Sequence, residues 1–179
     1  QQADVWMSDE GFIQIRPRVN EVPLVSIVIP TRGDAKRIWG VHTCLVEHAV
    51  NSILRQTTYA NYEIVVVHDY KDGAPIYNID LGADPRVKVV PYQAPFNFSD
   101  KCNVGVKASS GDVIVLLNDD VQLVSPDWLE TFVAMLQYEG VGMVGPMLLL
   151  EDGRIQSAGH TNIPTPHNLG SGLSSKSVG

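Results

Sequence analysis

The sequence predicts an α/β domain built on a mostly parallel sheet, and two observations support this. Apolar runs of strand length alternate with segments of helical periodicity, and the runs fall at residues 24–29, 63–67, 87–90 and 112–117. The first run is almost continuously hydrophobic, which is typical of a strand buried on both faces. Strands separated by helices are joined by right-handed crossovers, so neighbouring strands are expected to be parallel.

Three segments are predicted to be helices. Apolar residues recur with helical spacing from about residue 42 to residue 56, which gives the first helix. The second covers residues 97–110, with Asn97 or Ser99 as its N-cap. The third covers residues 125–139, because a serine and a proline stand at its start and a glycine follows its end.

The sequence pattern outside these strands and helices indicates one domain with a flanking segment at each end. Residues 141–150 form an apolar run that indicates a strand, and Asp152-Gly153 is typical of a tight hairpin. Residues 1–22 have no sustained period and are predicted to be an N-terminal arm, whereas residues 164–179 form a polar tail or loop rich in glycine and serine. The domain itself is expected to cover residues 23–163.

Composition excludes several classes of protein. The 179 residues are 44% hydrophobic and 18% charged, which is typical of one globular domain. A net charge of -7 with few basic clusters argues against a nucleic-acid partner. No apolar stretch approaches the length of a membrane span, and the N-terminal residues do not resemble a signal peptide. We therefore expect a cytoplasmic location.

Residues that follow the strands are the candidates for a binding site, because ligands of open α/β sheets bind beyond the carboxyl ends of the strands. The four segments at these ends are Thr31–Gly33, His68–Tyr70, Ala94–Ser99 and Asn118–Asp120. No glycine-rich dinucleotide or P-loop motif follows the first strand, so a bound phosphate would be held by a helix N-terminus or a divalent cation, and the cation is the favoured partner. Two adjacent carboxylates suit Mg²⁺ or Mn²⁺ that also binds substrate phosphates.

Each of these residues also has a simpler interpretation. Asp119 and Asp120 could be a solvated turn, and Asp69 could cap a loop. Arg32 could be a surface charge or could bind an anion. Phe98 is expected to pack as a staple at the start of its helix. The histidines lack the spacing of a zinc hydrolase, although His160 follows the predicted hairpin and could approach the site.

Several segments match one family in consistent order. They lie at residues 25–32, 62–69, 95–99, 108–112, 117–120, 125–129, 141–145 and 152–159, with Asn103 between the third and fourth. Together they resemble family 2 glycosyltransferases, whose GT-A fold is a Rossmann-like three-layer α/β/α arrangement. The resemblance covers residues 23–160. It implies a nucleotide-sugar donor as substrate.

The resemblance also implies how the nucleotide is held. Pro30, Thr31 and Arg32 would line the pocket of the base, and Asp69 would hydrogen-bond the base. His68, Tyr70 and Lys71 differ from the residues usual in the family beside this aspartate, which leaves the identity of the base open.

The diphosphate would be held through a metal ion. Asp120, the last residue of a signature like D-x-D, would ligate Mn²⁺ or Mg²⁺, while Asp119 would contact the ribose or support the metal. Asn103 and Lys101 would line the same cleft. Such a cation would stabilise the negative charge that develops on the departing nucleoside diphosphate.

The family inverts the anomeric centre by direct displacement, with a carboxylate as general base on the acceptor hydroxyl. That carboxylate is expected downstream of this chain, because Glu151 and Asp152 are better explained as hairpin residues. The predicted function is the donor-binding part of a glycosyltransferase of cell-surface polysaccharide synthesis. The acceptor would be a saccharide or a lipid-linked glycoconjugate, and the parent protein could associate peripherally with the inner face of the membrane.

Two other functions remain open at this point. A nucleotidyltransferase would also use carboxylates, a metal and an α/β sheet, but it normally has a basic glycine-rich loop after its first strand, and Thr31–Asp34 is a poor one. A non-catalytic binding or scaffolding domain could keep the fold without turnover, since fold does not imply function.

Overall fold

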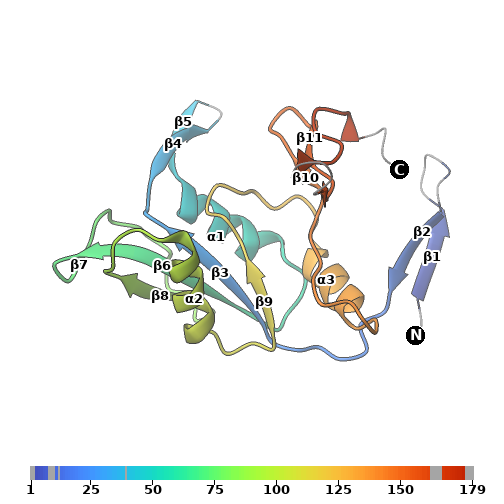
Figure 1. Cartoon of the computed structure of the whole chain (residues 1–179), viewed down its shortest axis with the longest axis horizontal. Coiled ribbons are helices and arrows are strands. Elements are labelled where there is room, and N and C mark those ends of the chain that lie inside the picture. The colour runs from blue at the N-terminus through green and yellow to red at the C-terminus, as the bar shows by residue number, and fades with distance from the viewer. Residues whose placement is uncertain (1–2, 8–10, 12, 39, 162–166, 176–179) are drawn as a thin grey trace. The chain divides into compact units, whose positions relative to one another are not determined.

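The computed structural model describes residues 3–7, 11, 13–38, 40–161 and 167–175, whose helices and strands are drawn in Figure 1. Contacts divide the chain into two units, a larger one of residues 20–133 and a smaller one made of residues 1–19 and 134–179. The domain boundaries that the sequence suggests, at residues 22 and 163, stay a prediction.

The larger unit contains a five-stranded sheet. Its strands are β3 (Val25–Thr31), β6 (Tyr62–Lys71), β7 (Ala74–Pro75), β8 (Val87–Tyr92) and β9 (Val113–Leu116). β3 lies between β6 and β9 and is parallel to both, and β8 is parallel to β6 on its other side. The short β7 pairs antiparallel with the end of β6. The prediction of a mostly parallel α/β sheet is therefore confirmed.

Helices connect these strands as the sequence pattern predicts. α1 (Leu45–Gln56) lies between β3 and β6 in sequence, α2 (Phe98–Ala108) lies between β8 and β9, and α3 (Trp128–Leu136) follows β9. Figure 1 shows α1 and α2 on opposite sides of the sheet, which gives the three layers. Asn97 is the N-cap of α2, because its side chain accepts a hydrogen bond from the amide of Asp100 at 3.1 Å.

Two predictions about the helices are wrong. α1 begins at Leu45 and not near residue 42, because β5 (Val41–Cys44) pairs antiparallel with β4 (Ala35–Ile38) and forms a hairpin that the sequence pattern does not predict. Phe98 is 50% exposed at the start of α2, so its ring does not pack as the predicted staple requires.

The core is built around β3, in which every residue is buried. Burial of both faces explains why this strand shows no alternation of apolar and polar residues. Helix α2 approaches the sheet closely at Gly105, where an added Cβ would lie 2.3 Å from Val28 Cγ1 and 2.9 Å from Val67 Cγ2. Glycine is therefore required here by packing, although it weakens a helix.

Gly105→Ala is expected to destabilise the larger unit. Alanine favours the helix, but its methyl group would force apart two valines that are fully buried, and overpacking of this kind leaves a net loss of about 1–2 kcal/mol in the free energy of unfolding. Urea unfolding followed by circular dichroism measures the loss. Lys107→Ala, at an exposed position of the same helix, is the control. Equal stability of the two variants would contradict this packing.

β9 is more exposed than the continuous apolar run at residues 112–117 suggests. Ile114 is 36% exposed and Leu116 is 58% exposed, whereas the alternate residues are half-buried. Within the described residues β9 pairs with β3 alone, so it is an edge strand of the sheet. The face that carries Ile114 and Leu116 is exposed.

The smaller unit consists of short antiparallel pairs. β10 (Leu148–Leu149) pairs with β11 (Ile155–Ser157), which confirms the predicted hairpin. Residues 141–147 are not a strand, contrary to the prediction, and two glycines and a proline interrupt their apolar pattern.

Both ends of the chain contain strands that the sequence pattern does not reveal. β1 (Ala3–Met7) pairs with β2 (Ile13–Pro17) inside the predicted arm. β12 (His160–Thr161) pairs with β13 (His167–Asn168), which lies in the predicted tail. Residues 164–166 and 176–179 of that tail lie outside the described residues. Among the described segments, no helix combines the length and the apolar character that a membrane crossing needs.

Candidate functional site

The parallel strands of the larger unit bring three of the predicted site residues to one edge. Thr31 ends β3 and lies beside His68 of β6, so Asp69 follows at the same edge. β9 is parallel to β3, with Leu116 beside Val28, and the chain then continues to Asp119. These carboxyl ends belong to segments that are far apart in sequence.

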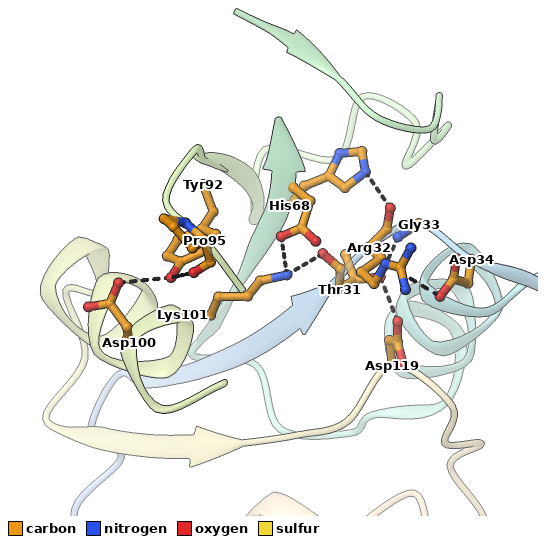
Figure 2. Close-up of polar contacts among 11 residues, drawn as sticks. Thr31, Arg32, Gly33, Asp34, His68, Tyr92, Pro95, Asp100, Lys101 and Asp119 are labelled. Carbon is orange, nitrogen blue, oxygen red and sulfur yellow. Dashed lines mark hydrogen bonds and ion pairs between the residues drawn. The ribbon is translucent and has the colours of Figure 1, made fainter. Parts of the chain in front are cut away.

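Thr31 holds the first of the two adjacent aspartates. Its hydroxyl donates a hydrogen bond to Asp119 Oδ2 at 2.6 Å and accepts one from the amide of Gly33 at 2.9 Å. Figure 2 shows Thr31 and Asp119 facing each other across this contact. Asp119 is half-buried and Asp120 is exposed in the same turn. One carboxylate is therefore fixed and the next is free to bind a ligand.

Lys101 is placed differently from the prediction that it lines a cleft. It is 1% exposed, and its ammonium lies 2.6 Å from Asp69 Oδ1 and 2.6 Å from the carbonyl oxygen of Thr31. The same ammonium lies over the ring of Tyr92, 5.6 Å from its centroid. Figure 2 shows the lysine extending from α2 toward the end of β3. Its contacts lie inside the protein.

The other predicted residues are spread around this edge. Pro30 is buried within β3, beside Val67 of β6. Arg32 is exposed, and its Nε lies 4.0 Å from Asp34 Oδ2, which is a weak contact. Asn103 is exposed on α2, and within the described residues its side chain makes no hydrogen bond. His160 belongs to the smaller unit.

His68 is a buried residue that lies in one of the candidate segments, but sequence reasoning gave it no role in the site. Its Nε2 lies 3.1 Å from the carbonyl oxygen of Arg32, so the proton is assigned to this nitrogen. An added Cβ at Gly33, which has a φ of +83°, would lie 2.8 Å from the same Nε2. The imidazole thus packs against the backbone of the turn after β3 and stabilises this turn. Strand alternation places it on the face opposite Asp69, which was the available signal.

A surface pocket of about 410 Å³ adjoins this turn. Its lining residues come from the turn after β3, the hairpin that follows it and the loop after β7, and they are Gly33, Asp34, Ala35, His42, Cys44, Tyr77 and Asn78.

His68 should make stability depend on pH near neutrality. Burial lowers the pKa of His68 from 6.5, and the charge of Lys101 adds to this, although the bond to Arg32 and the charge of Asp69 oppose it. Below about pH 6.5, His68 therefore binds a proton more readily in the unfolded chain than in the folded chain. The free energy of unfolding falls as pH falls.

The loss through this histidine can reach at most about 1.4 kcal/mol per pH unit, the limit for one proton. Urea unfolding at pH 7.5, 6.5 and 5.5 should show this slope in the wild type and in His42→Gln, which changes an exposed residue. His68→Gln should lack it. An unchanged slope in His68→Gln would show that this imidazole is not the group responsible.

Comparison with known proteins gives consistent results. The sequence profile described as Glycosyl transferase family 2 matches residues 26–169. An uncharacterized protein, y4gI of Sinorhizobium fredii, is 42% identical over 76% of this chain and 14% of its own length. The O-antigen biosynthesis protein RfbC of Myxococcus xanthus is 31% identical over 82% of this chain and 11% of its own length. The chain thus spans a small part of each relative.

A solved structure supports the fold. The mannosyltransferase PcManGT from Pyrobaculum calidifontis, in complex with GDP-Man and Mn²⁺, aligns with 70% of this chain and 36% of its own chain, with a TM-score of 0.52 and 17% sequence identity. Because the identity is low, this likeness concerns the fold alone. The profile match and the two relatives show the family: the chain belongs to glycosyl transferase family 2, with a fold of the GT-A type.

Proposed function

We propose that this chain is the donor-binding part of an inverting, metal-dependent glycosyltransferase. The observation that supports this best is the meeting of Thr31 and Asp119 at the carboxyl edge of the sheet, with Asp69 tied to Thr31 through Lys101. Ligands of open α/β sheets bind at this edge. Family membership makes a nucleotide sugar the expected ligand.

The base would bind on the side of Asp69. Oδ1 of this carboxylate is taken by Lys101, and Oδ2 has no hydrogen-bond partner among the described residues. A free carboxylate oxygen accepts a hydrogen bond, so Oδ2 suits an N–H group of a base. Pro30 and Thr31 would form the wall of this subsite, and the exposed guanidinium of Arg32 is available to an anionic ligand.

The residues present fit a divalent cation at Asp119 and Asp120. The described residues hold no group of three or more His, Cys, Asp or Glu side chains that could bind a metal alone. Mg²⁺ and related cations commonly take one or two carboxylates and complete their coordination with substrate phosphates, so two adjacent aspartates suffice. Mn²⁺ is also present in the structure of the mannosyltransferase relative.

Each residue has a distinct part in this proposal. Asp120 would hold the cation from its exposed position, and Thr31 would orient Asp119 beside it. When bound, the cation would neutralise charge that develops on the departing diphosphate. Asn103 is proposed to line the cleft. We assign the general base to none of the described residues.

The acceptor and the cellular role are the least constrained parts of the proposal. The relative RfbC is named for O-antigen biosynthesis, which supports a role in cell-surface polysaccharide synthesis. We propose a saccharide or lipid-linked glycoconjugate as acceptor. A cytoplasmic location, at the inner face of the membrane, is the proposed setting.

A thermal-shift panel of UDP, GDP, ADP and CDP, each with and without Mn²⁺, tests donor binding. A ligand at 100 times its Kd adds about 2.7 kcal/mol to stability, so a nucleotide that binds should raise the melting temperature. At least one nucleotide should do so only with Mn²⁺, because the proposed site holds the diphosphate through the cation. Asp120→Ala should weaken this binding at least tenfold, whereas Asp112→Ala, which removes an exposed aspartate just before β9, should not. Metal-independent stabilisation would argue against the metal site. No stabilisation by any nucleotide would favour a scaffolding domain.

A further inference from the structure

We infer that Lys101 is the positioning residue that presents Asp69 to the base of the donor nucleotide. This inference rests on the proposed function and adds to it a residue that does not itself touch the ligand. Lys101 is 1% exposed, so contact with a nucleotide bound at the surface is not its role. Its ammonium instead contacts groups from three different elements.

The ammonium of Lys101 has three neighbours that favour a positive charge. It donates to Asp69 Oδ1 at 2.6 Å and to the carbonyl oxygen of Thr31 at 2.6 Å. It also lies over the ring of Tyr92, whose centroid is 5.6 Å away. Tyr92 is itself fixed, because its hydroxyl donates to Asp100 Oδ2 at 2.9 Å. The ammonium therefore has little freedom to move.

The two oxygen partners depend on Lys101 to different degrees. Thr31 is also held by the pairing of β3 with β6 and by the amide of Gly33. The side chain of Asp69 has Lys101 as its only partner among the described residues. Without the lysine, a carboxylate that is 8% exposed would lose its counter-charge and would turn toward solvent. Loss of Lys101 should thus affect Asp69 more than the Thr31–Asp119 contact.

The position of Lys101 on α2 explains how it reaches both strands. Lys101 and Gly105 are four residues apart and lie on one face of the helix. Gly105 brings that face against β3 and β6, so the lysine must extend along the sheet toward its carboxyl edge. A larger residue at position 105 would move the ammonium away from Asp69.

The test separates binding of the base from binding of the diphosphate. We define the base increment as the Kd of inorganic pyrophosphate divided by the Kd of the best nucleotide of the panel, both measured with Mn²⁺ by calorimetry. The wild type should show an increment above tenfold. Lys101→Met should reduce the increment at least tenfold, with the Kd of pyrophosphate changed less than threefold. Lys107→Met, at an exposed position of the same helix, should retain the full increment.

The other outcomes distinguish failure of this inference from failure of the proposed function. A full increment in Lys101→Met, or an equal loss of pyrophosphate and nucleotide binding, would overturn the inference and leave donor binding intact. A wild type that binds neither ligand would overturn the proposed function. A wild type without a base increment would remove the role of Asp69 and the inference with it.

Lys101→Gln is the second variant, and it keeps the test decisive if Lys101→Met fails to fold. Its amide can donate to both oxygens but carries no charge and is shorter. The increment should fall at least threefold in this variant. If it stays at the wild-type value in whichever variant is folded at the assay temperature, Lys101 does not position Asp69.

Discussion

Asp69→Ala should lower the free energy of unfolding of the larger unit by about 3–5 kcal/mol, the range measured when one partner of a buried ion pair is removed. Lys101 is 1% exposed, and the substitution removes the carboxylate that lies 2.6 Å from its ammonium. The remaining bond to the carbonyl of Thr31 cannot balance that charge. Chemical unfolding of wild type and variant measures the loss.

The double variant Asp69→Ala/Lys101→Met provides the internal control. It leaves no buried charge, and buried ion pairs can often be replaced by apolar residues with little loss, so it should recover most of the stability. Asp84→Ala removes an aspartate from a partly exposed pair with Arg86 and should have a much smaller effect, because solvent screens that pair. Additive losses from the two single substitutions would show that Asp69 and Lys101 do not act as a pair.

Glu63→Ala should destabilise the opposite edge of the sheet by about 2 kcal/mol, because it leaves the buried hydroxyl of Ser26 without its acceptor. Glu63 Oε1 accepts hydrogen bonds from the hydroxyl of Ser26 and the amide of Ser110, both at 2.6 Å. Its Oε2 lies 3.0 Å from Lys88 Nζ. One carboxylate thus joins β3, β6, β8 and the turn before β9.

Glu63→Gln separates the hydrogen bonds from the charge. Its amide oxygen can still accept both bonds, so we expect a loss of only about 1 kcal/mol at neutral pH. The pH dependence should also change. Burial alone would raise the pKa of Glu63, but the bonds from Ser26 and Ser110 and the contact with Lys88 outweigh it and lower the pKa from 4.5. The wild type should therefore lose this contribution as pH falls below about 4.5, and Glu63→Gln should not. Equal acid sensitivity of the two proteins would exclude Glu63 as its source.

Much of the fold can be predicted from the sequence because strand and helix periods are local properties. The run at residues 24–29 has too few polar residues for a half-exposed strand, and β3 is buried throughout. The β4–β5 hairpin could not be predicted, since residues 35–44 contain no alternating apolar pattern. β9 shows the opposite error. Its apolar run resembles that of β3, but its position at the edge of the sheet exposes Ile114 and Leu116.

For the candidate site, the sequence by itself determined which segments share one edge of the sheet. Parallel strands end at the same edge, so the ends of β3 and β9 were expected there together. The strand order, which sets β9 beside β3 and lets Thr31 contact Asp119, was decided by the tertiary structure. Only the tertiary structure decided the place of Lys101. A lysine is normally exposed, and its burial here depends on Asp69, which lies 32 residues away in sequence on a different strand. The residues near Lys101 in sequence do not reveal this counter-charge. The close approach of α2 at Gly105 brings the helix face with Lys101 onto the sheet and so places the ammonium beside Asp69.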